Sequence, residues 1–237
     1  MRLLFVRHGD PCKTTYGLTK KGEEEVKLLA NYFKENKIIE KAYTSTAERA
    51  TETTRILKKY INVNVEEVAW LQEFKYSIVL PNGERQFPWE ITPSLWIQNG
   101  AMFDFKKCLE DPIYKSGSIK ERCVERWDEL DKVLEKYGYK RCLNYYNVKN
   151  ANKKTLLFIS HFATISVLLS HLLNIPLSIV MHMFWCSPSS YTELRSEEIE
   201  CGKALFRCIT YGNLSHLSGI NDLKSFYGLQ KEVFMED

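Results

Sequence analysis

The chain has 237 residues, which is enough for one large domain or for one domain with an insertion. Lys and Arg total 33 and Asp and Glu total 30, and this excess of +3 is spread along the chain rather than gathered into the basic stripe of a nucleic-acid binder. The seven cysteines are scattered without a C-x-x-C pair, which argues against a disulfide framework and a zinc site and favours a reducing compartment.

Two apolar segments bear on whether the chain enters a membrane. The N-terminus reaches Arg7 and His8 after a short apolar run, which is not the pattern of a signal peptide. The stretch 162–185 is interrupted by polar residues and by Pro176, whereas a membrane span needs about 20 mostly apolar residues. We therefore expect buried helices in this stretch and a soluble, cytoplasmic protein that binds no membrane.

Strands and helices alternate in the first third of the chain. The first apolar run opens into Arg-His-Gly, which is the pattern of a buried strand followed by a loop. Ser45 with Glu48 three residues later predicts a capping box at the start of a helix. The predicted strands are residues 2–6, 42–44 and 63–70, and the predicted helices are residues 19–36 and 45–59.

The alternation stops between residues 77 and 152. This stretch is rich in proline, and Ser118 with Glu121 predicts a second capping box, for a helix that ends near Gly138. We interpret 77–152 as an insertion that caps the main domain. Its tryptophans either bind an aromatic or sugar phosphate or form the cap's own small core; they are Trp89, Trp96 and Trp127.

The order of the elements defines the fold class. Strand–helix order resumes after the insertion, with strands at 155–160, 191–194 and 204–210 and a helix from residue 162. Strands that alternate with helices predict a mainly parallel sheet covered on both faces. We therefore expect an α/β fold with three αβα layers, a mainly parallel central sheet and a helical cap insertion. The whole chain, 1–237, forms a single domain with 77–152 as its cap.

Three polar segments directly follow predicted strands. Ligands of such sheets bind beyond the carboxyl ends of the strands. Arg7-His8, Ser45 and His161 should therefore converge at one edge. Each also has a plainer interpretation, because an Arg or His at a strand end is often satisfied by backbone carbonyls or by a place in the core.

Arg49 lies in the first turn of the second predicted helix. Helix amides and a guanidinium at this place could together hold one phosphate group. For an isolated helix, a surface ion pair from Arg49 to Glu48 or Glu52 is the simpler interpretation.

The combination of these segments resembles the histidine phosphatase superfamily, in its phosphoglycerate mutase-like branch. The resemblance runs in order from Arg2 to about Leu173 and skips the cap. One departure is Phe162, which follows His161 where the family usually has Gly, so its ring must be accommodated, with the lining of the substrate pocket as one place for it. The matching segments are Leu4-Phe5-Val6-Arg7-His8-Gly9, Leu18-Thr19-Lys20-Lys21-Gly22, Thr44-Ser45 through Arg49-Ala50 to Thr53, Leu71-Gln72-Glu73 and Ile159-Ser160-His161.

The resemblance implies that His8 is a nucleophile and that Arg7, Arg49 and protonated His161 form a phosphate pocket. A neutral imidazole is not repelled by a phosphomonoester, and the phosphoramidate that it forms can be hydrolysed by water. Preorganised cations stabilise the charge on the equatorial oxygens of the transition state. Because three protein cations supply this stabilisation, the implied mechanism needs neither a metal nor a cofactor.

Glu73 is the candidate general acid and base, by its place after the third predicted strand. An alkoxide leaving group needs a proton as its bond breaks, and a neighbouring phosphate dianion would favour the protonated carboxyl. The alternative is that Glu73 is an exposed loop carboxylate. Glu66, Glu67 and Glu90 are weaker candidates for the same role.

The predicted function is that of a metal-independent phosphatase, a hydrolase that acts on a small phosphorylated metabolite through a phosphohistidine. Phosphoryl transfer of the phosphoglycerate mutase type is an alternative, but the mutases' Glu-Ser-x-Trp-Asn run is replaced here by the residues from Asp10 to Thr14. A catalytically silent, phosphate-binding relative is a second alternative. Such relatives tend to lose the nucleophile or a phosphate-binding Arg, and this chain retains both.

Overall fold

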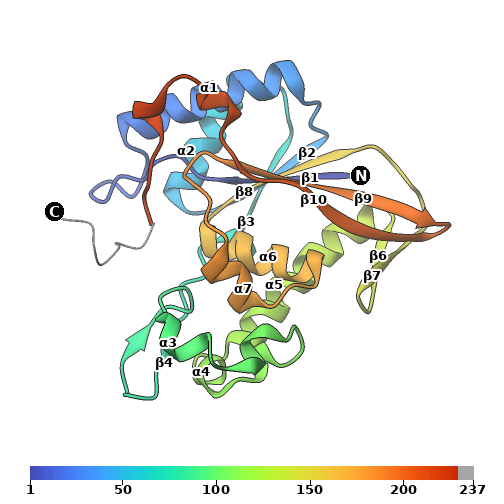
Figure 1. The fold of residues 1–237 in the computed structure, drawn as a ribbon. Helices are drawn as coiled ribbons and strands as arrows, with labels where there is room; N and C mark the ends of the chain where they lie inside the picture. The colour runs from blue at the N-terminus through green and yellow to red at the C-terminus, as the bar shows by residue number, and fades with distance from the viewer. Residues whose placement is uncertain (229–237) are drawn as a thin grey trace.

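The computed structural model describes residues 1–228 and is built around one eight-stranded sheet (Figure 1). The strand order across the sheet is β3-β2-β8-β1-β9-β10-β7-β6. A separate short hairpin joins β4 (Ile78–Val79) and β5 (Arg85–Gln86). The strands of the large sheet are β1 (Arg2–Arg7), β2 (Lys41–Ser45), β3 (Val65–Val68), β6 (Tyr139–Cys142), β7 (Tyr145–Val148), β8 (Thr155–Ser160), β9 (Tyr191–Glu200) and β10 (Lys203–Asn213).

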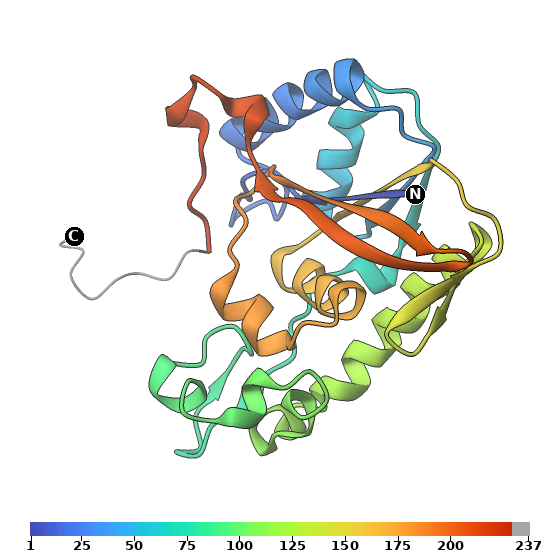
Figure 2. The same cartoon turned by 45° about the vertical axis from the view of Figure 1, so that its right-hand side comes forward.

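Helices lie on both faces of the sheet, so the predicted three-layer α/β class is confirmed. Figures 1 and 2 show α1 and α2 on one face and α5, α6 and α7 on the other. Of the helices within residues 1–228, none combines the length and apolar character that crossing a membrane requires. The helices are α1 (Lys20–Asn36), α2 (Glu48–Leu57), α3 (Pro93–Trp96), α4 (Pro112–Ser116), α5 (Ile119–Lys136), α6 (Phe162–Leu173) and α7 (Leu177–Met183).

Between its terminal residues Arg2 and Arg7, strand β1 is apolar because both of its faces are buried. Leu4 and Val6 pack in one core cluster with side chains of α1 and α2. Leu3 and Phe5 point the other way, into a second cluster with side chains of α5 and α6. A strand buried on both faces has no polar alternation, as expected at the centre of a sheet covered by helices.

The parallel strands bring distant chain segments to one edge of the sheet. β1 pairs with β8 so that Arg7 lies opposite Ser160, and β2 pairs with the other side of β8. The residue after each strand then lies at the same carboxyl edge. His8, Ser45 and His161 are therefore neighbours, although they are far apart in the sequence.

The sheet is parallel in one half and antiparallel in the other. β3, β2, β8 and β1 run parallel and carry the residues that the sequence singled out. β9, β10, β7 and β6 are paired antiparallel, beginning with β1 against β9. The expected closing strands correspond to β9 and β10, a long hairpin at the right of Figure 1.

Two strands lie inside the stretch that the sequence indicated as a cap. β6 and β7 form the far edge of the main sheet, yet their sequences, YKRC and YYNV, are short and polar. Only Tyr139 and Tyr146 are fully buried in them, so no apolar run marked them as strands. The division of the chain into a main domain with 77–152 as its cap stays a prediction, and this part of the range belongs to the sheet.

Helix α5 connects the short elements around α3 and α4 to the sheet. Its first half contributes Ile119 and Cys123 to a separate core cluster with the short elements around α3 and α4. Its second half contributes Leu130 and Leu134 to the cluster beneath the sheet. Figure 1 shows the short elements gathered at one end of the molecule, below α6 and α7.

The two expected capping boxes are absent at the described helix starts, although both helices form. Ser118 precedes α5 in a left-handed conformation with φ of 51°, which is not the extended geometry of an N-cap residue, and its side chain makes no capping bond. The N-cap of α2 is Ala47, and Ser45 lies two residues earlier. The Ser45 hydroxyl accepts a hydrogen bond from the Ala47 amide at 3.2 Å and faces His161 instead.

The three tryptophans of the predicted cap have different surroundings. Trp96 is buried in the cap core, where its ring stacks on His182 with 4.7 Å between centroids. Trp127 stacks on His171 and donates a hydrogen bond to the Val167 carbonyl. Both side chains are packing residues, which leaves Trp89 as the tryptophan that lines the pocket next to His8.

Candidate active site

The backbone that carries His8 packs closely on α1. A side chain at Gly9 would place its Cβ 2.7 Å from the Gly22 carbonyl oxygen and 2.8 Å from Val26 Cγ2, so only glycine fits there. The Gly9 amide donates to Thr53 Oγ1 at 3.1 Å, and this hydroxyl donates to the Arg49 carbonyl. These contacts fix the loop after β1 against the first turns of α1 and α2.

The tautomer of His8 follows from its hydrogen bonds. Nδ1 lies 2.8 Å from the Gly9 carbonyl oxygen, which can only accept, so Nδ1 carries the proton. Nε2 is left with a lone pair and accepts a hydrogen bond from Arg49 Nε at 2.9 Å. Burial, with Arg7 and Arg49 nearby, holds the pKa of His8 well below its usual range. His8 is therefore a neutral imidazole with its nucleophilic nitrogen next to a guanidinium.

Arg49 points into the pocket rather than along the surface of α2. Its Nη2 lies 4.0 Å from Glu73 Oε2, in addition to the contact with His8. Glu48 and Glu52, the partners of the simpler interpretation, pair with Arg55 instead.

Arg7 is a buried guanidinium without a carboxylate partner among the described residues. Its Nη1 donates to the Cys186 carbonyl oxygen at 2.7 Å. Its Cζ lies 5.9 Å from the Phe162 ring centroid and 5.8 Å from that of Tyr227. Phe162, which departs from the family pattern, thus packs beneath the guanidinium of Arg7 and leaves its positive charge free for an anion.

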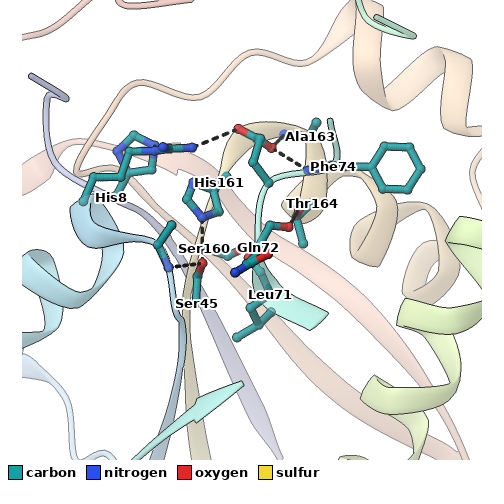
Figure 3. A network of polar contacts seen from close by, with 12 residues as sticks. His8, Ser45, Leu71, Gln72, Phe74, Ser160, His161, Ala163 and Thr164 are labelled. Atoms are coloured by element: carbon teal, nitrogen blue, oxygen red, sulfur yellow. Dashed lines mark hydrogen bonds and ion pairs between the residues drawn. The ribbon is translucent and has the colours of Figure 1, made fainter. Parts of the chain in front are cut away.

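His161 precedes α6 and contacts Ser45 (Figure 3). Its Nε2 lies 2.8 Å from Ser45 Oγ, and its ring centroid lies 5.0 Å from that of His8. Its Nδ1 is buried and has no hydrogen-bond partner in the described part of the chain. Burial and the neighbouring His8, Arg49 and Arg7 hold the pKa of His161 well below its usual range. This direction favours a neutral imidazole in this structure, and a protonated His161 in the phosphate complex stays a prediction.

Glu73 is held in place by backbone amides. Its Oε1 accepts hydrogen bonds from Phe74 at 3.1 Å and from Ala163, in the first turn of α6, at 3.2 Å (Figure 3). The segment before it is attached to β8 and α6, because Ser160 Oγ donates to the Leu71 carbonyl and Thr164 Oγ1 to the Gln72 carbonyl. Its carboxylate therefore faces the same pocket as His8.

The other carboxylates have different positions. Glu66 and Glu67 lie on the edge strand β3. Glu90 lines the pocket, but its Oε2 accepts a hydrogen bond from the Phe87 amide at 2.9 Å. Glu73 is the carboxylate that also lies beside Arg49.

These side chains share one pocket of about 440 Å³, lined by Arg7, His8, Arg49 and Glu73. The sequence did not indicate Tyr16, Phe87 or Tyr227, which also line it. They come from a loop, the cap and the C-terminal segment, and no strand end or helix start marked them. Among the described residues, no group of three or more His, Cys, Asp or Glu side chains is arranged to hold a metal ion.

We expect nitrogen-15 NMR to show His8 in the neutral Nδ1–H form at pH 6, where an ordinary histidine is about three-quarters protonated. The unfolded chain in urea is the control and should titrate normally. Because the pKa of His8 and that of His161 are lowered on folding, the unfolded state takes up protons first. Their contribution to stability is therefore complete above about pH 6.5 and is lost as the pH falls. A protonated His8 signal at pH 6 in the folded protein would contradict the assignment.

The comparisons with known proteins agree with this geometry. Residues 3–86 match the model of the histidine phosphatase superfamily (branch 1). No curated protein is significantly similar to the chain in sequence. Solved structures share the fold: the phosphoserine phosphatase of Entamoeba histolytica, in complex with 3-phosphoglyceric acid, is 17% identical with a TM-score of 0.60, over 91% of this chain and 98% of that one.

Two further structures show the same likeness of fold. The α-ribazole phosphatase of Shigella flexneri is 17% identical with a TM-score of 0.55, over 90% of this chain and 97% of that one. The protein histidine phosphatase SixA, complexed with tungstate, is 18% identical with a TM-score of 0.50, over 87% and 94%. These likenesses concern the fold, within which the guanidinium groups of Arg7 and Arg49 line the pocket beside His8. The family that the motifs indicated is thus the one whose model matches residues 3–86.

Proposed function

We propose that the chain is a metal-independent phosphatase that hydrolyses small phosphomonoesters through a phosphohistidine on His8. The observation that carries the proposal is the hydrogen bonding of His8. The Gly9 carbonyl fixes the proton on Nδ1, and Nε2 presents its lone pair beside Arg49 in a pocket that also holds Glu73. A neutral nucleophile, cations for the phosphoryl oxygens and a carboxyl for the leaving group are the parts that this reaction needs.

In the first step, His8 Nε2 attacks phosphorus. The P–N bond forms as the bond from phosphorus to the ester oxygen breaks, and protonated Glu73 gives its proton to the leaving alkoxide. Arg7 and Arg49 stabilise the charge on the equatorial oxygens of the phosphoryl group. Arg49, which donates to His8 Nε2 in this structure, is then placed to contact the phosphoryl group as it is transferred to that nitrogen.

In the second step, water attacks the phosphohistidine. The Glu73 carboxylate takes a proton from the water as the new P–O bond forms and the P–N bond breaks, which releases inorganic phosphate and restores neutral His8. Glu73 ends the cycle protonated again, ready for the next substrate.

Ser45 gives His161 a role that does not require a positive charge. If the Ser45 hydroxyl donates to Nε2 of His161, the imidazole proton is on Nδ1, the buried nitrogen that has no partner in residues 1–228. A phosphoryl oxygen would satisfy this donor. A dianion bound there would also favour protonation of His161, so the neutral ring of this structure is compatible with a charged one in the complex.

The main alternative is phosphoryl transfer of the mutase type. A mutase must exclude water while the product reorients, and it needs groups for the second charge of its substrate. The sequence lacks the segments that provide these groups in the mutases. The phosphoserine phosphatase of similar fold was solved with 3-phosphoglyceric acid, which makes 3-phosphoglycerate the natural test substrate.

Phosphorus NMR of reactions started with 3-phosphoglycerate and with an aryl phosphate tests the proposal. We expect release of inorganic phosphate to exceed formation of 2-phosphoglycerate greatly, and we expect the same rates after exhaustive chelation. Formation of 2-phosphoglycerate faster than phosphate would identify a mutase. Loss of activity on chelation, restored by a divalent ion, would contradict metal independence, and no turnover of either substrate would favour the silent relative.

A further inference from the structure

The pocket next to His8 has an aromatic wall for which the phosphoryl chemistry has no use. Phe87, Trp89 and Tyr16 line the same 440 Å³ as His8 and Arg49. A phosphoryl group needs cations and hydrogen-bond donors rather than ring faces. The wall therefore faces the part of a substrate that lies beyond the phosphate.

Phe87 is placed as a platform. Its ring stacks on Trp89, with centroids 4.8 Å apart and planes 7° apart. Trp89 in turn packs against the cap core, whereas Phe87 belongs to none of the three hydrophobic clusters of the described residues. One face of the Phe87 ring is thus supported by the fold, and the ring lines the pocket.

Hydrogen bonds within the turn that carries the platform hold it in the described conformation. The Phe87 amide donates to the Glu90 carboxylate at 2.9 Å, and the Glu90 amide donates to the Phe87 carbonyl at 2.9 Å. Pro88, which lies between Phe87 and Trp89 in the sequence, is buried. A ring that is already fixed loses little entropy when a second ring stacks on it.

Tyr16 lines the same pocket but comes from the loop after β1, far in sequence from Phe87. It lies at the tip of a loop closed by the Cys12 amide and the Gly17 carbonyl, with a φ of 61°. A left-handed tyrosine costs conformational energy, and such residues gather at binding sites. Tyr16 as a residue is 73% exposed, so the described fold leaves most of its surface uncovered.

We propose that this wall is a subsite for a planar aromatic ring in the leaving group. On this inference, which rests on the proposed function, the substrates are small phosphomonoesters that carry such a ring. Ring faces stack on any planar π system, and a base stacked on an aromatic side chain contributes about 1–3 kcal/mol, or roughly 5- to 150-fold. The pocket volume lies in the range of about 300–1,000 Å³ that is usual for small-molecule sites.

Two pairs of substrates distinguish a ring joined directly to the ester carbon from a ring separated from it by a sugar. Benzyl phosphate and cyclohexylmethyl phosphate differ in the planarity of the ring. Adenosine 5′-monophosphate and ribose 5-phosphate differ in the presence of the base. Within each pair the leaving group is a primary alkoxide, so the ratio of kcat/KM reports ring recognition rather than leaving-group ability. We expect the aromatic member to be favoured about tenfold or more in at least one pair.

Variants of Phe87 locate the recognition. Phe87→Ala should reduce the ratio of the favoured pair to near one, and Phe87→Leu, which keeps apolar bulk without a π face, should reduce it in part. The matched control is Phe103→Ala, because Phe103 also stacks on a cap tryptophan, Trp96, with 5.5 Å between centroids. Phe103 does not line the described pocket, so its removal should leave the ratio unchanged.

The outcomes separate this inference from the proposed function. Ratios near one in both pairs, with brisk hydrolysis of all four substrates, would overturn the aromatic subsite and leave the phosphatase intact. A ratio that survives Phe87→Ala would also overturn it. If no phosphomonoester is hydrolysed, the proposed function itself fails. Circular dichroism of each variant separates a lost contact from lost folding.

Discussion

His8→Ala is expected to lower kcat for every phosphomonoester by at least about 10⁴-fold, because the atom that forms the P–N bond is removed. In this structure the ring has one free lone pair, on Nε2, and it is directed at Arg49. Initial rates of phosphate release from an aryl phosphate measure the loss.

A trapping experiment distinguishes loss of the nucleophile from general damage. Wild-type protein quenched during turnover with a labelled substrate should carry phosphate that is stable to base and labile to acid, and His8→Ala should carry none. His182→Ala is the matched control, because His182 is a partly buried imidazole on α7 that stacks on Trp96 and does not line the pocket beside His8. It should retain activity and label. Substantial turnover by His8→Ala would rule out the phosphohistidine mechanism.

The parallel half of the fold could be predicted because its residues repeat a simple pattern. Apolar runs buried on both faces give β1 and β8, and the polar residue after each run falls at the carboxyl edge. That argument alone brings His8 and His161 to one place. Arg49 follows because the first turn of α2 begins at the same edge.

β6 and β7 were harder to predict because they form the far edge of the sheet and are partly exposed. In β7 the sequence YYNV has one fully buried residue, Tyr146, and the pairing partner is β10, some sixty residues away. Contacts that join such distant segments leave no local periodicity. The contact between the Tyr227 ring and Arg7 also joins distant segments, because only folding brings the C-terminal segment to β1.

The charge state of His161 also depends on the folded structure. Nothing in the sequence around His161 indicates a shifted pKa, and the family resemblance implied a protonated imidazole. Burial, together with the nearby His8, Arg49 and Arg7, lowers the pKa of His161 and so favours its neutral form in the folded chain. The Ser45 hydroxyl, expected to cap α2, instead lies 2.8 Å from this ring.

Glu73→Gln is expected to slow hydrolysis of alkyl phosphates by about 10²–10⁴-fold, the usual contribution of a general acid. Gln keeps a carbonyl oxygen for the Phe74 and Ala163 amides that hold Glu73, so the local structure should survive. The variant has no carboxyl proton to give the leaving alkoxide. Initial rates of phosphate release from an alkyl phosphate and from 4-nitrophenyl phosphate measure the effect.

The two substrates should respond differently, because 4-nitrophenolate leaves without a proton and its transfer to His8 depends less on Glu73. With 4-nitrophenyl phosphate, phosphoryl transfer to His8, followed as the burst of 4-nitrophenolate, should slow by less than about tenfold. Hydrolysis of the phosphohistidine should slow by more than that. Glu67→Gln is the control, because Glu67 lies on the edge strand β3 and does not line the pocket, so both rates should stay unchanged. An equal loss on both substrates would show that Glu73 positions Arg49 across 4.0 Å rather than transferring a proton.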